Sequence, residues 1–145
     1  MNISILYGSE TGNAQGLAEQ AGDYLKTHIR YEVSVKDLGD VSVSDLKSLD
    51  NILLITSTWG DGEPPSNAGK MLEDLQNSSE DLSSTSFAVF AIGSSSFPQF
   101  CQAGIDFDAL LEKLGSKRLA DLEMADDNYS EQFATWLSTI QSNFV

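Results

Sequence analysis

Five short apolar runs alternate along the chain with segments of helical periodicity, and this alternation limits the fold more than any other feature. The runs span residues 3–7, 31–35, 52–55, 87–92 and 119–124. Apolar residues recur at the three- and four-residue spacing of amphipathic helices across 14–25, 68–75, 107–114 and 133–140. Strands that alternate with helices build a parallel sheet covered by helices on both faces. With 145 residues, the sequence predicts a single α/β domain over 1–145.

Local signals add detail to this pattern. Gly115 follows the periodic segment 107–114 and is placed to end that helix. A short helical turn is expected over 44–49, capped by Ser42 or Ser44. The serine-rich stretch 78–86 is expected to be a loop.

The composition of the strands predicts their order. Runs 52–55 and 87–92 are continuously apolar, as strands covered on both faces are, whereas 31–35 and 119–124 contain alternating polar residues, which suits edge strands. With right-handed crossovers, this is compatible with a five-stranded parallel sheet in the order 2-1-3-4-5. The order of such a sheet reverses between strands 1 and 3, and ligands bind there, outside the carboxyl ends of the strands.

The net charge restricts the possible partners. The chain has 22 acidic and 8 basic residues, for a net charge of −14. Nucleic acid and anionic membrane surfaces would be repelled, so neither is expected as a partner. Two interpretations stay open: the acidity serves solubility alone, or it provides a docking field for basic partners.

The chain contains a single cysteine and a single histidine. Cys101 alone excludes an internal disulfide, and with His28 it cannot form a Cys/His zinc site. We expect Cys101 to be a small buried residue at a helix start and His28 to lie at the surface. The first residues lack the features of a signal peptide, and no apolar run approaches the ~18 residues of a membrane span. These observations predict a cytoplasmic protein without a metal site.

The loop after the first strand, Gly8-Ser9-Glu10-Thr11-Gly12-Asn13, leads into a helix. Small residues and hydroxyls at a helix start offer N–H and O–H donors to an anion. The loop is neither a Walker motif nor Gly-x-Gly-x-x-Gly. It is either an ordinary turn with an N-cap or a phosphate cradle made of neutral donors.

Two further loops of the same predicted sheet edge each contain an aromatic residue. Trp59 lies among the polar and flexible residues 57–67, and Phe97 follows a serine run within 93–101. The glycines that flank Asp61 allow the peptide there to present either its C=O or its N–H to a ligand. Singly, each aromatic is more often a packing residue. Together with a phosphate cradle, they describe a site for a phosphorylated planar heterocycle.

These three loops resemble those of the flavodoxin family, most closely the FMN domains of diflavin reductases of the sulfite reductase flavoprotein type. The likeness covers nearly the whole chain. It implies a flavodoxin-like fold with FMN as cofactor, with Thr11 among the phosphate ligands and Trp59 and Phe97 on the two faces of the flavin. The cofactor-binding residues that it implies are Ser9, Glu10, Thr11, Gly12, Asn13, Ala14, Ser57, Thr58, Trp59, Gly60, Asp61, Gly62, Gly93, Ser94, Ser95, Phe97, Phe100, Cys101 and Asp126.

The chain departs from the family pattern at two positions. Ala14 replaces a threonine that ends the phosphate loop of many flavodoxins, and Phe97 replaces the usual tyrosine. The run 119–124 reads as one uninterrupted strand, which is typical of a short-chain flavodoxin. The resemblance also implies that the Gly60–Asp61 peptide reorients with the redox state of the flavin.

The function implied by the resemblance is that of a monomeric one-electron carrier without catalytic residues of its own. A ferredoxin- or flavodoxin-type NADPH reductase would be the donor, and a haem or iron–sulfur protein the acceptor. Basic surfaces of these partners would dock on Asp61, Glu63, Asp126 and Asp127. The alternative is the FMN domain or subunit of a larger diflavin reductase.

Two other function classes fit the sequence less well. A signalling receiver domain shares the strand order, but it needs an acidic pair after strand 1 and an aspartate after strand 3. The chain has Tyr7-Gly8-Ser9 and Thr56-Ser57 at these places. An FMN enzyme acting on a small substrate lacks a histidine or cysteine with a base partner in the loops.

Overall fold

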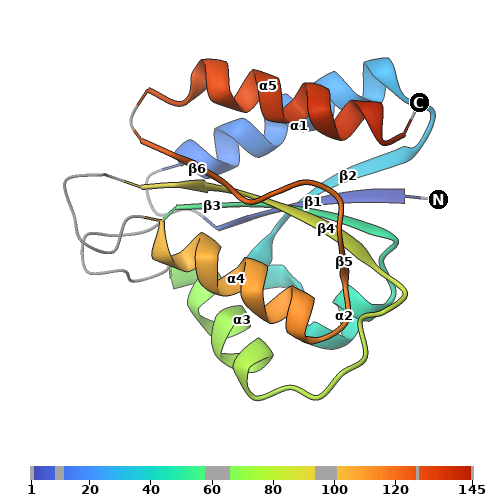
Figure 1. The fold of residues 1–145 in the computed structure, drawn as a ribbon, viewed down its shortest axis with the longest axis vertical. Coiled ribbons are helices and arrows are strands. Elements are labelled where there is room, and N and C mark those ends of the chain that lie inside the picture. The colour runs from blue at the N-terminus through green and yellow to red at the C-terminus, as the bar shows by residue number, and fades with distance from the viewer. Residues whose placement is uncertain (1, 9–11, 58–65, 94–100, 127, 145) are drawn as a thin grey trace.

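Parallel strands form the middle layer of the structure, a computed structural model that describes residues 2–8, 12–57, 66–93, 101–126 and 128–144. In chain order, the elements are β1 (Asn2–Gly8), α1 (Asn13–His28), β2 (Glu32–Asp37), the 3-10 turn η1 (Leu38–Asp40), α2 (Val43–Lys47), β3 (Asn51–Ser57), α3 (Ser66–Gln76), β4 (Ser86–Ile92), α4 (Gln102–Lys113), β5 (Lys117–Arg118), β6 (Glu123–Ala125) and α5 (Ser130–Ser142). Helices α1 and α5 cover one face of the sheet, and α2, α3 and α4 lie on the other (Figure 1).

The sheet has the order β2-β1-β3-β4-β5, and β6 also pairs with β4. This confirms the predicted order 2-1-3-4-5. The apolar strands β3 and β4 are buried over six residues each, whereas β2 is exposed at Glu32 and Lys36 and buried only at Val33. Continuous burial of the central strands is the reason that their sequences contain apolar residues on both faces.

Each face of the sheet carries its own hydrophobic core. The α1/α5 face is centred on buried residues such as Ile5, Leu25, Phe90, Phe133 and Trp136. On the opposite face Leu6, Leu54, Val89, Met71 and Phe107 pack together between the sheet and α3 and α4. Successive strand residues therefore alternate between the two cores, and the strand register cannot shift by one residue without exchanging them.

The fifth strand position differs from the prediction of one uninterrupted strand over 119–124. The chain forms two short strands there: β5 pairs with the start of β4 and β6 with its end. Leu119 and Ala120 are consecutive, yet both pack against the α1/α5 core. A regular strand turns successive side chains to opposite faces, so packing both residues on one face breaks the strand. The prediction was wrong over 119–122.

The predicted helices are confirmed, with two informative ends. Ser42 caps α2 through a reciprocal pair of hydrogen bonds with Asp45, so Ser42 and not Ser44 is the cap. Gly115 has φ +102° directly after α4, a left-handed conformation that ends the helix. Residues 77–85 form no regular element, so the predicted loop is confirmed over 78–85, whereas Ser86 already belongs to β4.

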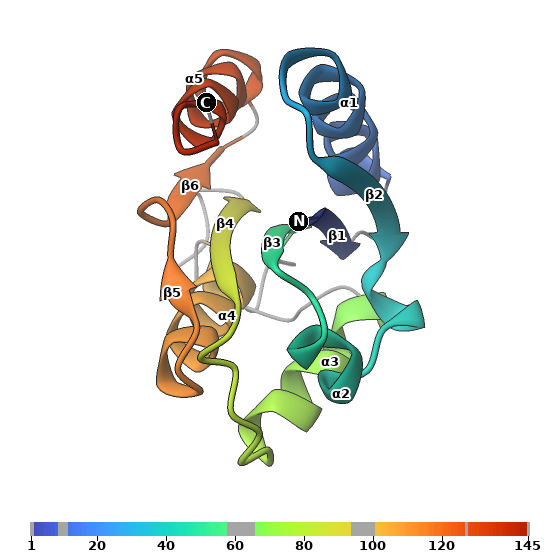
Figure 2. The ribbon, with the colours of Figure 1, turned by 90° about the vertical axis from the view of Figure 1, so that its right-hand side faces the viewer.

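The two ends of the sheet are distinct. Asn2 begins β1 at the amino edge, and Phe144 lies near it, with its ring 5.1 Å from the ring of Tyr31 just before β2. Both marked termini lie on this side of the molecule in two views (Figures 1 and 2). The opposite, carboxyl edge is formed by the strand ends at Gly8, Ser57, Ile92 and Ala125. In the described part of the chain, no helix has the length and apolarity needed to cross a membrane.

Candidate functional site

The carboxyl edge brings together the ends of four strands that are far apart in sequence. The register places Gly8 beside Thr56, Ser57 beside Ile92, and Ile92 beside Ala125. The topology reverses between β1 and β3, and ligands of open parallel sheets bind at such a point. The structure thus places the described ends of the three predicted loops at one edge.

Helix α1 begins at this edge from a left-handed glycine. Gly12 is the N-cap, with φ +90°, and its C=O accepts the Gly16 N–H at 2.9 Å. A Cβ added at Gly12 would meet no atom of the described residues within 4 Å. Asn13 is exposed and Ala14 is fully buried. The side chain of Ala14 therefore packs in the core, and only its backbone could serve a ligand at the helix start.

The helices that follow the three central strands share an electrostatic feature. Helices α1, α3 and α4 have no acidic residue in the first turn, although 22 of the 145 residues are acidic. Helices α2 and α5 carry Asp45 and Glu131 there. A carboxylate in the first turn would occupy or repel the position that an anion prefers. The three helix starts at the carboxyl edge are thus suited to a phosphate.

The ends of β1 and β3 supply small and neutral groups. Thr56 is fully buried, and its hydroxyl donates to the Ser57 carbonyl at 3.3 Å. Burial, followed by the charge of Asp37, raises the pKa of the half-buried Tyr7 above its ordinary value. Tyr7 is therefore neutral at physiological pH and adds no charge beside the helix start.

At the end of β4, a backbone carbonyl of the neighbouring strand joins two segments. The Ala125 C=O accepts the Gly93 N–H at 2.9 Å and lies 3.8 Å from the Cys101 Sγ, which can donate to it. Cys101 is fully buried at the start of α4, as predicted, and burial raises the pKa of its thiol to about 11. Asp126 follows directly and is half-buried. Ala125 was absent from the predicted site, because a backbone acceptor leaves no signal in residue type.

The predicted site residues fall into two groups. Gly12, Asn13, Ala14, Ser57, Gly93, Cys101 and Asp126 are described, and all belong to the carboxyl edge or to a helix that starts there. The others lie outside the described residues: Ser9, Glu10, Thr11, Thr58, Trp59, Gly60, Asp61, Gly62, Ser94, Ser95, Phe97 and Phe100, together with the docking residues Glu63 and Asp127. Their roles stay predictions.

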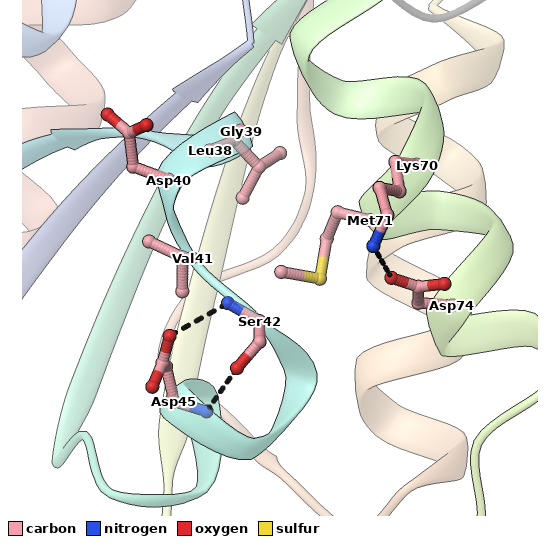
Figure 3. Close-up of a pocket in the computed structure, with 9 residues that line it drawn as sticks. All are labelled: Leu38, Gly39, Asp40, Val41, Ser42, Asp45, Lys70, Met71 and Asp74. Carbon is pink, nitrogen blue, oxygen red and sulfur yellow. Dashed lines mark hydrogen bonds and ion pairs between the residues drawn. The ribbon is translucent and has the colours of Figure 1, made fainter.

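A separate hollow of about 240 Å³ lies between η1, α2 and α3 (Figure 3). Four of its polar side chains are paired with one another: Ser42 and Asp45 cap α2, and Lys70 Nζ lies 3.1 Å from Asp74 Oδ2. Met71 supplies an apolar wall. Among the described residues, no cluster of His, Cys, Asp and Glu could hold a metal ion. The carboxyl edge is therefore the better candidate site.

Comparison with known sequences gives a family. The sequence model of the family described as flavodoxin matches residues 5–136. The chain is 42% identical over 139 residues to the sulfite reductase [NADPH] flavoprotein alpha-component of Bacillus subtilis. That alignment covers 95% of this chain and 23% of the relative. The chain thus spans about a quarter of the length of this curated relative.

Comparison with solved structures gives the same fold. Flavodoxin 2 from Bacillus cereus superposes with a TM-score of 0.87 and 26% identity, covering 99% of this chain and all of that one. A short-chain flavodoxin associated with a bacterial microcompartment gives a TM-score of 0.85 at 21% identity, with 99% and 97% coverage. The match extends to both ends of the sheet.

Proposed function

The chain belongs to the flavodoxin family, and we propose that it carries single electrons between a reductase and acceptor proteins. Its cofactor is FMN, the flavin of this family and of the matched flavoproteins. The observation that supports a phosphorylated flavin is the carboxyl edge, where α1, α3 and α4 begin without a first-turn carboxylate. When bound, FMN supplies the redox chemistry.

Among the described residues, backbone N–H groups and a helix dipole would bind the phosphate of FMN. The start of α1, at Gly12 and Asn13, presents N–H groups and the positive end of the helix dipole to a phosphate. The hydroxyls of Ser9 and Thr11 would complete this cradle, and Trp59 and Phe97 would cover the two faces of the ring. The neutral donors would bind the phosphate end of FMN, and the flat aromatic side chains would cover its ring.

The cradle is tested by comparing two flavins that differ only in the phosphate. We expect FMN to bind far more tightly than riboflavin in a fluorescence titration of the apoprotein. Thr11→Ala should weaken FMN by roughly 1.5–3 kcal/mol, because a hydrogen bond to a charged group is lost, and it should leave riboflavin unchanged. Equal affinities for FMN and riboflavin would contradict the phosphate site.

The partners are proposed from charge. With a net charge of −14, a carrier would meet basic surfaces of an NADPH-dependent reductase and of a haem or iron–sulfur acceptor through Asp61, Glu63, Asp126 and Asp127. Association should slow as salt rises, because screening shortens to ~3 Å at 1 M. Glu63→Gln with Asp127→Asn should slow reduction by a ferredoxin-type reductase in stopped flow while FMN stays bound. A reduction rate that does not change with salt would contradict docking through the acidic residues and would indicate that the acidity serves solubility alone.

A second candidate function is favoured by the longer relatives. Because the chain spans 23% of the sulfite reductase flavoprotein alpha-component, it can also serve as the FMN domain of a larger diflavin reductase. A free carrier, which we propose as a single cytoplasmic monomeric domain, is reduced by a separately added reductase at a rate proportional to reductase concentration. A domain of a larger enzyme is reduced efficiently only when joined to its flavin and NADPH-binding modules.

A further inference from the structure

Strand β2 forms an open edge of the sheet along its whole length. In the described part of the chain it pairs only with β1, over the six residues Glu32–Asp37, and it is the outermost strand on its side of the sheet (Figure 2). The opposite edge is broken into β5, of two residues, and β6, of three. An unpaired strand edge can add another strand, and proteins often shorten or break their edges to prevent this. The unbroken β2 is therefore the edge on which a further strand can be added.

The side chains of β2 alternate between an apolar and a charged face. Val33 and Val35 both pack against the α1/α5 core, and a Cβ added to Gly22 of α1 would lie 2.7 Å from Val35 Cγ2. Glu32 and Lys36 share the other face and are exposed. Neither forms an ion pair with another described residue. They lie ~13 Å apart along the strand, so they cannot pair with each other within one chain.

We propose that β2 pairs in antiparallel orientation with β2 of a second copy of this chain, about a two-fold axis beside Ser34. In a two-fold interface residue i of one copy faces residue j of the other, and j faces i. Each Glu32 then lies opposite Lys36 of the other copy, and each Val33 lies opposite Val35. Opposite charges and β-branched residues are cross-strand partners that stabilise a sheet. The sequence of β2 is thus complementary to itself.

The neighbouring two-fold registers are less favourable. Residues directly opposite each other lie on the same face of a sheet, so the axis can move only from one residue to the next. An axis beside Val33 would bring Arg30 opposite Lys36, and like charges in this position are destabilising. An axis beside Val35 would bring Asp37 opposite Val33, on the apolar face. The register centred on the serine between the two valines avoids both.

The pairing is weak and reversible. A strand pair of six residues is only ~20 Å long, and it buries less than the ~1,000 Å² of a stable interface. Each copy also has a net charge of −14, so the two copies repel each other until salt screens the charge. The carrier proposed above therefore stays a monomer when dilute and pairs at high local concentration. Because the paired strands run in opposite directions, the two carboxyl edges point away from each other and both stay open.

The test exchanges charges across the pair. Glu32→Lys and Lys36→Glu each place like charges opposite each other, whereas the double variant, or an equimolar mixture of the two single variants, restores opposite charges. Glu73→Lys, the same change of charge at an exposed position of α3, is the matched control. Association of the FMN-bound protein is measured by sedimentation equilibrium from micromolar to millimolar concentration at low and high salt. NMR amide shifts of the same samples locate the contact.

We expect the mass of the parent to rise toward that of a dimer with concentration, more steeply at high salt, with amide shifts centred on β2. Each single variant should weaken association about tenfold, because two favourable cross-strand pairs become unfavourable. The double variant and the mixture should associate like the parent, and Glu73→Lys at least as strongly.

Three results would overturn the proposal: a parent that stays monomeric at millimolar concentration in high salt, shifts that fall outside β2, or a mixture that associates no better than the single variants. Reduction of FMN by a reductase should be the same for all variants that pair and for those that do not, since the carboxyl edges stay open. A failure of electron transfer is therefore a separate result from a failure of pairing.

Discussion

The amino and carboxyl edges of the sheet are held together by different kinds of bonds. At the amino edge, side chains join the elements: the Asn51 amide donates to the Asn2 carbonyl, and Thr85 bonds Ser116 in the interior. At the carboxyl edge, the described contacts are mainly backbone turns and small residues, with Gly12 and Cys101 both left-handed at helix starts. The amino edge is thus held mainly by bonds between side chains, and the carboxyl edge presents mainly backbone groups.

The difference indicates how stability and binding are divided within the domain. Side chains that bond each other at the amino edge stabilise the fold and leave little for a ligand. Backbone groups at helix starts keep donors directed at the space where a ligand binds. Binding residues lie on loops carried by a rigid scaffold for the same reason. Substitutions at the two edges should therefore separate stability from FMN affinity.

The largest effect is expected where α4 lies closest to the sheet. Gly104→Ala would place a Cβ 2.3 Å from that of Ala91, and such overpacking should lower the free energy of unfolding by about 3 kcal/mol. FMN affinity should fall too, because α4 starts at the carboxyl edge. Gly16→Ala is the matched control: its Cβ would meet no atom within 4 Å in the part of the chain that the structure describes, so it should stabilise α1 by about 0.5–1 kcal/mol. Urea unfolding measures the free energy of unfolding of both variants. Similar losses in the two would show that the close approach of α4 to β4 does not cause the effect of Gly104→Ala.

The next effect is a loss of stability in alkali. The Cys101 thiol has an ordinary pKa of 9.0 and a folded pKa of about 11. Between these values the unfolded chain loses the proton and the folded chain keeps it, so stability falls as pH rises from 9 to 11. The loss due to this thiol is about 2 kcal/mol at pH 11. Cys101→Ala should show a shallower decline in unfolding free energy over this range. Parallel pH profiles for the two proteins would mean that the thiol titrates alike in both states.

Two left-handed glycines, one at each edge, give a direct test of the division. Gly12 has φ +90° before α1, and Gly115 has φ +102° after α4. Replacing either with alanine should lower stability by about 1–2 kcal/mol, because a Cβ is disfavoured in this conformation. Only Gly12→Ala should weaken FMN, since Gly115 lies at the amino edge. Calorimetric titration measures the FMN affinity of both variants. An equal loss of affinity in Gly115→Ala would contradict the proposed division between the two edges.

The smallest effect concerns the cap of α2. Ser42→Ala removes the hydroxyl that accepts the Asp45 N–H at 3.1 Å, while the Ser42 N–H still donates to Asp45 Oδ2. It should lower stability by about 1 kcal/mol without changing FMN affinity. Hydrogen bonds from Ser42 lower the pKa of Asp45 below its ordinary 3.8. That contribution is present above pH 3.8 and is lost as pH falls through the lowered value. The variant loses only the share of this lowering that comes from the Ser42 side chain, because the larger share comes from the Ser42 N–H, which alanine keeps. The stability gap between parent and variant should therefore narrow slightly in acid, and a gap that widened would contradict the assignment.

The strand order of the sheet could be predicted from the sequence, but the contacts at the ends of its strands and helices could not. The apolar runs of β3 and β4 predicted two buried central strands, because full burial leaves a visible pattern. The break between β5 and β6 was missed, since Ala120, Leu122 and Met124 alternate with acidic residues as a strand would. Only the packing of the consecutive Leu119 and Ala120 against one core shows otherwise. Ala125 was missed because its contribution is a carbonyl oxygen, which every residue has. The left-handed conformation of Cys101 is enforced by tertiary packing, which local sequence does not encode.

The position of the termini has a mechanical consequence. Asn2 and Phe144 both lie at the amino edge, and the carboxyl edge, which we propose as the FMN site, lies on the opposite side of the sheet (Figure 1). A tether joined to either end would leave the proposed electron-exchanging surface at the carboxyl edge free to turn toward a partner. Its length would set the effective concentration at which the domain meets each partner. Anchored through either end to an electrode or a second protein, the domain would present its flavin outward.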